Sequence, residues 1–229
     1  MIVENVLYIN LDSRPDRKKH IENMLSSCPY EYQKIAGVDL SDTSGYDIYN
    51  PNPKVYNSVG ILGCFLAHKK AIKYLLDINK NADSYSILIE DDAYIDTLLW
   101  GVLDSLDISS IDTDIFMVDA INTQSNYGTL PMARDKYPVI FKNLDGDYFF
   151  EKNSKRPAFG THFMIIPNNK IQYIYDNLDT ATTVMLIDNF YNYNSNISTS
   201  FMETGLVYQI KNQILSSNIN NKFLLWPTE

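Results

Sequence analysis

Three consecutive carboxylates, Glu90-Asp91-Asp92, are the strongest chemical signal in the sequence. Three neighbouring negative charges repel one another unless a cation or solvent relieves the repulsion. They directly follow the apolar run at 86–89, which is typical of a buried strand, so they should emerge at a sheet edge that a ligand can reach. Carboxylate oxygens suit Mg²⁺ or Mn²⁺, which keep open positions for phosphate oxygens. The alternative is a solvated acidic turn after a strand.

Two arginines form a second cluster near the N-terminus. Arg14 and Arg17 lie at the expected start of a helix and make up half of the four arginines in the chain. A guanidinium fork matches phosphate geometry, and a helix N-terminus adds partial positive charge. Alternatively, this is a surface helix on which Asp12 and Asp16 pair with the arginines. Taken together, an anion site at one strand end and a metal site at another could hold a nucleoside diphosphate between them.

The elements that must position these clusters alternate along the first half of the chain. Apolar runs predict strands at 6–9, 30–36, 86–89 and 114–118. Helical spacing predicts helices from Pro15 to before Pro29, at 58–79 and at 96–106, the first capped by Asp12 or Ser13. This order predicts an α/β fold with a mostly parallel central sheet and ligands at the carboxyl ends of its strands. The polar segment 37–57 is a long loop, of a length that is usually functional or mobile.

The second half predicts strands near 139–141, 147–150 and 162–166, and helices near 168–177 and 187–193. Neither a repeat nor a linker interrupts the sequence, so we expect a single domain over 1–229. A lone histidine on an apolar helix face, such as His68, is usually a core residue. The same holds for its neighbour Cys64 one turn earlier.

Composition excludes several classes of protein. Apolar residues make up 45% and charged residues 21% of the chain, as in ordinary soluble globules. The net charge of −9 disfavours nucleic acid as a main partner and a broad basic surface for anionic lipid. Two cysteines, Cys28 and Cys64, cannot form a disulfide framework. The N-terminus lacks the pattern of a signal peptide and no run is long enough to span a membrane, so we expect a cytoplasmic protein, at most peripheral to a membrane.

Four short motifs, in order and spacing, resemble those of glycosyltransferase family 25. They are Ile9-Asn10-Leu11-Asp12-Ser13-Arg14-Pro15-Asp16-Arg17, Ile35-Ala36-Gly37-Val38-Asp39, Gly63-Cys64-Phe65-Leu66-Ala67-His68 and Leu88-Ile89-Glu90-Asp91-Asp92-Ala93. Weaker similarity lies at Gly160-Thr161 and Ile187-Asp188-Asn189-Phe190. One departure is Ala67, where the family usually has serine.

The resemblance implies a GT-A-type, Rossmann-like nucleotide-sugar-binding fold. Residues 1–120 would bind the donor and residues 121–229 the acceptor. The family is similar to inverting transferases that use UDP-galactose or UDP-glucose with Mn²⁺ (or Mg²⁺). A glycan, a lipid-linked oligosaccharide or lipooligosaccharide, and a protein side chain all remain possible acceptors.

The resemblance also implies roles for particular residues. Glu90 and Asp92 would bind the metal. The UDP-sugar would be bound by Asn10, Leu11, Arg14, Arg17, Asp39, Glu90 and Asp91. Inversion needs a carboxylate that takes the proton of the acceptor hydroxyl. Asp188 is the candidate for this general base, with a helix N-cap as its alternative role and Asp119 as the reserve. Cys64 and His68 would pack beside the nucleotide site.

Two other functions compete with this interpretation. A degenerate transferase domain would bind a glycan or nucleotide without turnover, which Ala67 leaves open. A metal-dependent phosphoesterase built on the acidic triplet would need further ligands from the three histidines, His20, His68 and His162.

Overall fold

The computed structural model describes residues 1–40, 43–50, 52–54, 56–119, 121–122, 139–142, 148–151, 158–204 and 206–209. Its helices are α1 (Pro15–Leu25), α2 (Ser58–Ile78), α3 (Leu98–Ser105), α4 (Ile171–Asp179) and α5 (Ile187–Tyr193), with a 3₁₀ turn η1 (Asn168–Lys170) before α4. The strands of the first half are β1 (Val3–Asn10), β2 (Tyr32–Ala36), β3 (Asp47–Ile48), β4 (Tyr85–Glu90), β5 (Ala93–Ile95), β6 (Ile115–Val118) and β7 (Ile121–Asn122). Those of the second half are β8 (Val139–Lys142), β9 (Tyr148–Glu151), β10 (Ala158–Phe159), β11 (Phe163–Pro167), β12 (Thr183–Val184), β13 (Thr199–Glu203) and β14 (Val207–Gln209).

One sheet organises the molecule, in the order β2-β1-β4-β11-β6-β13-β8-β9. β11 runs antiparallel to β4 and β6, and β9 runs antiparallel to β8, while the other neighbours are parallel. The predicted α/β class with a mostly parallel central sheet is therefore confirmed. The short pairs β12-β3 and β14-β5 lie outside this sheet.

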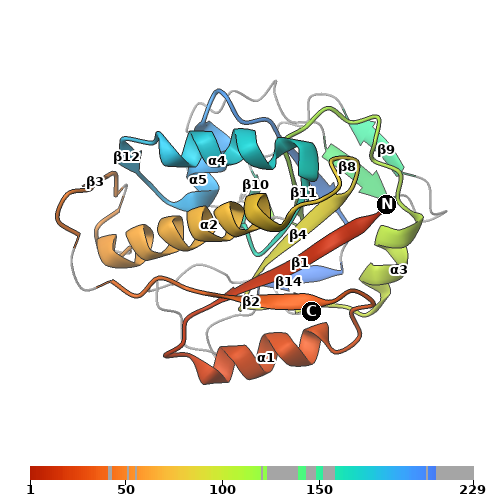
Figure 1. Ribbon diagram of the computed structural model, residues 1–229, viewed down its shortest axis with the longest axis horizontal. Helices are drawn as coiled ribbons and strands as arrows, with labels where there is room; N and C mark the ends of the chain where they lie inside the picture. The colour runs from red at the N-terminus through yellow and green to blue at the C-terminus, as the bar shows by residue number, and fades with distance from the viewer. Residues whose placement is uncertain are drawn as a thin grey trace.

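Helices cover both faces of the sheet, which explains why its strands are continuous apolar runs rather than alternating ones. α2, α4 and α5 pack on one face, where their apolar side chains join Leu7 and Leu88 from the strands. α1 and α3 pack on the other face, against Tyr8, Ile87 and Ile89 (Figure 1). Successive residues of β1 and β4 thus enter different cores, as the two-residue repeat of a strand requires. No helix in the described ranges has the length and apolar character needed to cross a membrane.

The structure corrects several predicted element boundaries and adds short strands that were not predicted. α1 begins at Pro15, as expected, but its N-cap is Arg14 and no side chain caps it, so neither Asp12 nor Ser13 has the predicted role. The long loop 37–57 contains β3, which pairs with β12. β5, β13 and β14 were not predicted, because short strands with mixed polar residues carry little periodic signal.

Candidate functional site

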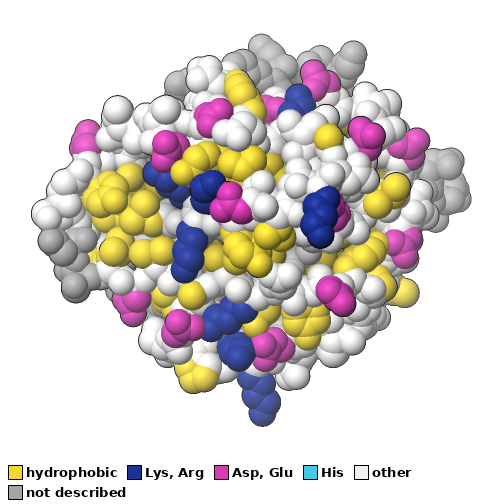
Figure 2. Space-filling model, viewed as in Figure 1, with side chains coloured by type: hydrophobic (Ala, Val, Ile, Leu, Met, Phe, Trp, Pro, Cys, Tyr) yellow, Lys and Arg dark blue, Asp and Glu magenta, His cyan; other side chains and the backbone are white. Residues whose placement is uncertain are grey.

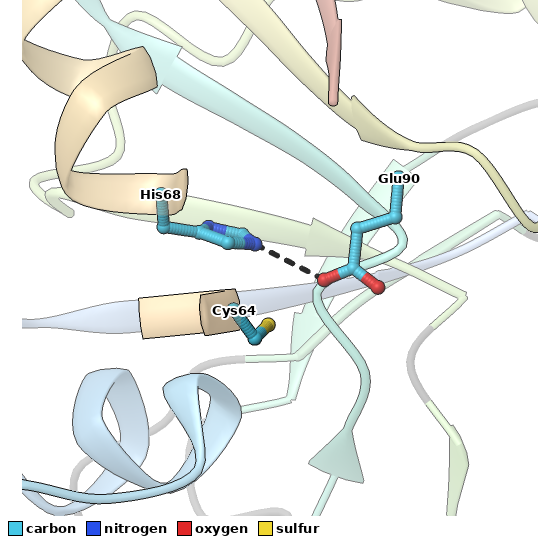
Figure 3. Close-up of side chains that lie close together, drawn as sticks. All are labelled: Cys64, His68 and Glu90. Atoms are coloured by element: carbon cyan, nitrogen blue, oxygen red, sulfur yellow. Dashed lines mark hydrogen bonds and ion pairs between the residues drawn. The ribbon is translucent and has the colours of Figure 1, made fainter. Parts of the chain in front are cut away.

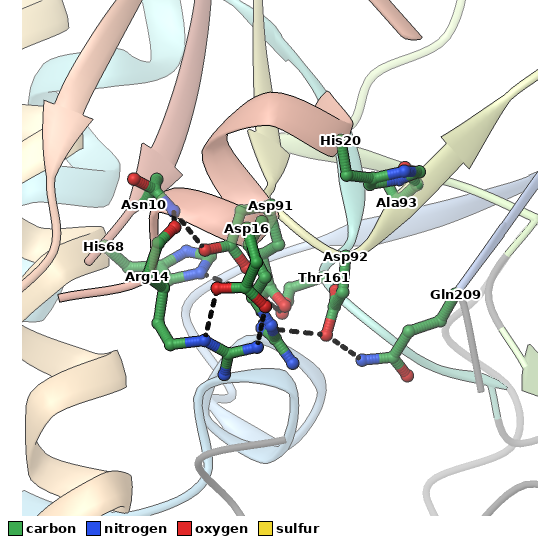
Figure 4. A network of polar contacts seen from close by, with 12 residues as sticks. Asn10, Arg14, Asp16, His20, His68, Asp91, Asp92, Ala93, Thr161 and Gln209 are labelled. Atoms are coloured by element: carbon green, nitrogen blue, oxygen red, sulfur yellow. Dashed lines mark hydrogen bonds and ion pairs between the residues drawn. The ribbon is translucent and has the colours of Figure 1, made fainter. Parts of the chain in front are cut away.

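Polar side chains converge at the edge of the sheet where β1 and β4 end (Figure 4). Asn10 is the last residue of β1 and Glu90 the last of β4. Because β11 is antiparallel to β4, its first residues lie at this same edge, and the Glu90 N–H donates to the His162 carbonyl at 3.0 Å. The predicted clusters at 10–17 and 90–92 therefore meet, as expected for the carboxyl ends of neighbouring strands.

Asp91 joins the two clusters. Its Oδ2 accepts a hydrogen bond from the Asn10 amide at 2.7 Å, and its Oδ1 accepts from Arg17 Nη1 at 2.7 Å. Both carboxylate oxygens are thus engaged inside the protein, and burial still raises the pKa of Asp91 despite the Arg17 charge. Asp91 was expected to contact the donor, but its contacts indicate that it holds β1, α1 and β4 together.

Arg17 is turned toward the acidic triplet. Its Nη1 also lies 3.4 Å from Asp92 Oδ2, and its side chain is only 10% exposed. A buried guanidinium between two carboxylates offsets part of their mutual repulsion. Arg17 was expected to lie close to the nucleotide pocket or to support it structurally, and its contacts with Asp91 and Asp92 agree with the supporting role.

Asp92 is the carboxylate of the triplet that can still accept a hydrogen bond or bind a cation. Its Oδ2 accepts from Gln209 Nε2 at 3.0 Å, and its Oδ1 is buried without a hydrogen-bond partner among the described residues. Burial, strengthened by the charge of Glu90, raises the pKa of Asp92 to about 7. A buried carboxylate oxygen that lacks a donor is unfavourable unless a cation or a proton satisfies it. This orphaned oxygen fits the predicted role of Asp92 as a metal ligand.

Glu90 lies beside Asp92, and the hydrogen bonds that its carboxylate accepts from described side chains all involve one oxygen, Oε1. Its Oε1 accepts from His68 Nε2 at 3.1 Å (Figure 3) and from the Thr161 hydroxyl. Although burial acts in the opposite direction, the contact with His68 lowers the pKa of the Glu90 carboxyl. Within the described part of the chain Oε2 accepts no hydrogen bond, so Glu90 and Asp92 together offer two oxygens to a hard cation such as Mn²⁺ or Mg²⁺.

Cys64, His68 and Glu90 form a second group whose ligand atoms lie within 4.8 Å of one another (Figure 3). A thiol and an imidazole could bind a soft metal such as Zn²⁺, but the surroundings of Cys64 and His68 do not favour it. Burial raises the pKa of the Cys64 thiol well above its usual value, whereas a metal needs the thiolate. His68 Nδ1 is buried and has no hydrogen-bond partner in the part of the chain that the structure describes, whereas a metal-binding histidine usually donates its other N–H. His68 is therefore best described as the donor that orients Glu90.

Two glycines of the family-like motifs allow this arrangement. A Cβ on Gly63 of α2 would lie 2.7 Å from the Val38 carbonyl oxygen, so only glycine lets the helix approach the end of β2 this closely. A Cβ on Gly37 would lie 2.9 Å from Leu11 Cδ2. The close approach of α2 brings Cys64 and His68 to the sheet edge, which gives a physical reason for glycine beside them.

Asp188 reaches the same site from the other half of the chain. It lies in the first turn of α5, and its Oδ1 accepts from the Asn189 N–H at 2.8 Å. Burial, assisted by the charge of the Glu90 carboxylate, raises the pKa of Asp188 to about 6. The N-cap of α5 is Leu186, so the alternative of an N-cap role for Asp188 is wrong. A carboxylate with a pKa near neutrality suits proton transfer.

The remaining predicted residues lie on the rim of the site. Arg14 is buried and forks onto Asp16, with distances of 2.9 and 2.7 Å, as the surface-helix alternative proposed. The charges of Asp91 and Asp92 also act on Arg14, so it lies on the same side of the molecule as the triplet (Figure 4). Leu11 packs against Gly37, and Asp39 is exposed two residues further on.

Asp119, the reserve base, has a structural role. It has a left-handed φ of 49°, and its carboxylate accepts from the N–H groups of Leu206 and Val207 at 3.0 and 2.9 Å. These bonds fix the turn between β13 and β14. That turn positions Gln209, a site residue that sequence reasoning missed because β14 carries too short a pattern to predict.

The α/β fold brings paired acidic side chains and the half-buried Asp188 to one region of the molecule, an arrangement that suits a transferase. Residues 3–190 match the family described as glycosyltransferase family 25 (LPS biosynthesis protein). The chain belongs to this family, which confirms the resemblance drawn from its motifs.

Comparisons beyond the family are distant. No curated protein is significantly similar in sequence. One solved structure, of a glycosyltransferase involved in the glycosylation of the major capsid of PBCV-1, aligns with a TM-score of 0.45 and 9% identity over 89% of this chain and 82% of its own. Another, from Bacillus anthracis and described as a glucose-1-phosphate thymidylyltransferase, aligns with a TM-score of 0.39 and 10% identity over 88% and 87%.

Proposed function

We propose that this glycosyltransferase is metal-dependent and inverting, and moves a hexose (galactose or glucose) from a UDP-sugar to a hydroxyl of a glycan, lipooligosaccharide or protein. The observation that carries the proposal is the buried Oδ1 of Asp92 beside Glu90 at the strand edge, which has no hydrogen-bond partner among the described residues. Such an oxygen needs a cation or a proton, and the neighbouring carboxylate of Glu90 favours a cation. Asp92 and Glu90 are the proposed metal ligands, and a bound Mn²⁺ or Mg²⁺ would stabilise the negative charge that develops on the leaving diphosphate.

The side chains divide the remaining tasks. The nucleotide part of the donor is bound by Asn10, Leu11 and Asp39. Arg14 supplies positive charge at the start of α1. Arg17 and Asp91 act behind them by fixing the triplet. Asp188 takes the proton of the acceptor hydroxyl as its oxygen attacks the anomeric carbon and UDP leaves from the opposite face. The raised pKa of Asp188, about 6, keeps the group a usable base near neutral pH.

The metal role is tested by thermal unfolding with UDP, with and without Mn²⁺. At a hundred times the Kd, a ligand specific for the native state adds about 2.7 kcal/mol, or roughly 5–10 °C for a chain of this size. We expect this shift only with both ligands, and we expect Asp92→Ala to abolish it. The matched control is Asp112→Ala, an exposed carboxylate away from the triplet, which should retain the full shift. No shift for the wild-type protein would contradict the proposal.

The base is tested in the same protein by Asp188→Asn. We expect normal UDP binding with Mn²⁺ but a loss of transfer of at least about 100-fold, the range for removal of a general base. Transfer equal to wild type would assign the base elsewhere. Binding without transfer in the wild-type protein would instead favour the degenerate transferase domain. The phosphoesterase is less favoured, because His68 is the only one of the three histidines that contacts a triplet carboxylate in the described chain.

A further inference from the structure

Two exposed tyrosines lie on segments that adjoin Asp188. Tyr49 is 58% and Tyr193 41% exposed, so both rings can be reached from solvent. Tyr193 is the last residue of α5, the helix that carries Asp188 in its first turn. Tyr49 follows β3, and its N–H donates to the Val184 carbonyl at 2.7 Å, four residues before Asp188. Segments from both halves of the chain thus bring one aromatic ring each to the same flank of the site.

The electrostatics agree with this placement. Burial raises the pKa of Tyr193, and the charges of Asp188 and Tyr49 act on it in the same direction, which agrees with Tyr193 lying within electrostatic range of each of them. Figure 2 shows hydrophobic side chains gathered over the end of α2 that lies next to β3. The segments that carry Tyr49 and Tyr193 are thus joined to the helix that carries the carboxylate proposed as the base.

Both hydroxyls are available to a ligand. Tyr30, Tyr74 and Tyr173 donate their hydroxyls to Asp104, Gln33 and the Asn196 carbonyl. By contrast, neither Tyr49 nor Tyr193 makes a hydrogen bond through its hydroxyl to any residue that the structure describes. A ring face and a free hydroxyl on one side chain offer both apolar and polar contacts.

The loop that carries Tyr49 is held in place. β3 pairs with β12, and the Asn50 amide donates to the Tyr56 carbonyl at 3.0 Å and to the Ser58 hydroxyl at 3.2 Å. These bonds join the loop to the start of α2. Little conformational entropy is then lost when a ligand binds to the tyrosine ring.

We propose that Tyr49 and Tyr193 form the acceptor subsite, a platform on which a hexose ring of the acceptor glycan lies with its hydroxyl directed at Asp188. The inference rests on the proposed function, because the position of the base sets where the acceptor must be. One face of a hexose ring carries C–H groups that pack on an aromatic ring, and its hydroxyls can bond to the tyrosine oxygens. A neutral sugar also suits a site beside Asp188 and the other carboxylates better than an anionic lipid does, because like charges repel.

The test compares the double variant Tyr49→Ala/Tyr193→Ala with wild type on lactose, maltose and cellobiose. Saturation-transfer NMR measures saccharide binding, and transfer assays give kcat/KM for each acceptor. We expect the variant to lose the NMR signal and at least tenfold in acceptor kcat/KM, with UDP binding in Mn²⁺ unchanged within twofold. Tyr173→Ala is the matched control, since this tyrosine is 44% exposed on α4 but borders a separate pocket lined by Asp112 and Ser195.

Each result separates the platform from the proposed function. Failure of the wild-type protein to bind UDP with Mn²⁺ contradicts the function, whereas the NMR signal reports on the platform alone. The platform is overturned if wild type binds none of the three disaccharides or if the double variant binds them equally well. A concentration-dependent dimer that the double variant abolishes would assign this surface to a second copy of the chain, and also overturns the proposal.

Discussion

At the scale of single residues, Asp92 shows how folding can prepare a carboxylate for a ligand. Its side chain is 10% exposed and receives only partial compensation from Arg17 at 3.4 Å. Glu90 adds a second negative charge nearby, so ionisation of Asp92 in the metal-free protein is unfavourable. The same surroundings that destabilise the free carboxylate increase its attraction for a divalent cation.

This predicts a pH dependence of stability in the metal-free protein. The pKa of Asp92 is about 7 in the folded chain and 3.8 when unperturbed, so the native state binds more protons between these values. The contribution of Asp92 to stability therefore falls as pH rises from about 4 to 7. We expect Asp92→Asn to be more stable than wild type at pH 8, by on the order of a few kcal/mol, and similar at pH 4.

Urea unfolding across this pH range in EDTA measures the effect. Asp112→Asn, whose side chain is 93% exposed, is the control and should follow the wild-type curve. Wild-type and Asp92→Asn curves that run parallel would contradict the prediction. With Mn²⁺ present, the wild-type protein should instead gain stability as pH rises, because the metal binds the ionised carboxylate.

At the scale of elements, the position of α2 decides whether the site can form. Gly63 lies against the Val38 carbonyl, and backbone cannot move aside as a flexible side chain can. We expect Gly63→Ala to lower the free energy of unfolding by about 1–3 kcal/mol, the usual cost of overpacking. It should also weaken UDP binding, because α2 carries His68, which orients Glu90. Urea unfolding and UDP titration measure the two effects.

Gly101 provides the matched control for that substitution. It lies in α3, and a Cβ there would meet nothing within 4 Å. Gly101→Ala should therefore be neutral or stabilising by about 0.5–1 kcal/mol, through the higher helix propensity of alanine. A Gly63→Ala variant as stable as Gly101→Ala would show that α2 does not need this close approach.

The elements also show what the sequence could and could not predict. The apolar face of α2 has a strong helical period, and β1, β4 and β6 contain continuous apolar runs, so their predicted positions agree with the structure within a few residues. The meeting of 10–17 with 90–92 followed from parallel strands ending at one edge. The ion pairs of Arg17 could not be predicted from the sequence. The spacing of Arg14 and Arg17 does not determine whether their side chains face a ligand or Asp91. Gln209 was missed because β14 is too short to carry a recognisable pattern. Thr161 was noted only as a weak similarity, and its bond to Glu90 could not be predicted because Thr161 lies outside any helix or strand.

At the scale of the whole molecule, two cores share one sheet. Alternate residues of β1 and β4 enter the core beneath α2 and the core beneath α1 and α3. The strands between them are buried on both sides, so neither core can lose its packing without exposing the back of the other. We infer that the described chain unfolds cooperatively, as small domains with a continuous core usually do.

This cooperativity is testable because Trp100 belongs to only one core, the one that α1 and α3 cover. Leu62, which is 0% exposed on α2, lies in the opposite core. We expect Leu62→Ala to cost about 3 kcal/mol through the cavity it leaves. In a Trp226→Phe background Trp100 is the only tryptophan, and its fluorescence midpoint in urea should fall together with the far-UV circular dichroism midpoint. Leu98→Ala, at a site 68% exposed, should leave both within about 0.5 kcal/mol. If Leu62→Ala shifted the circular dichroism midpoint but not that of Trp100, the two faces would unfold separately, and binding at the sheet edge could not stabilise both.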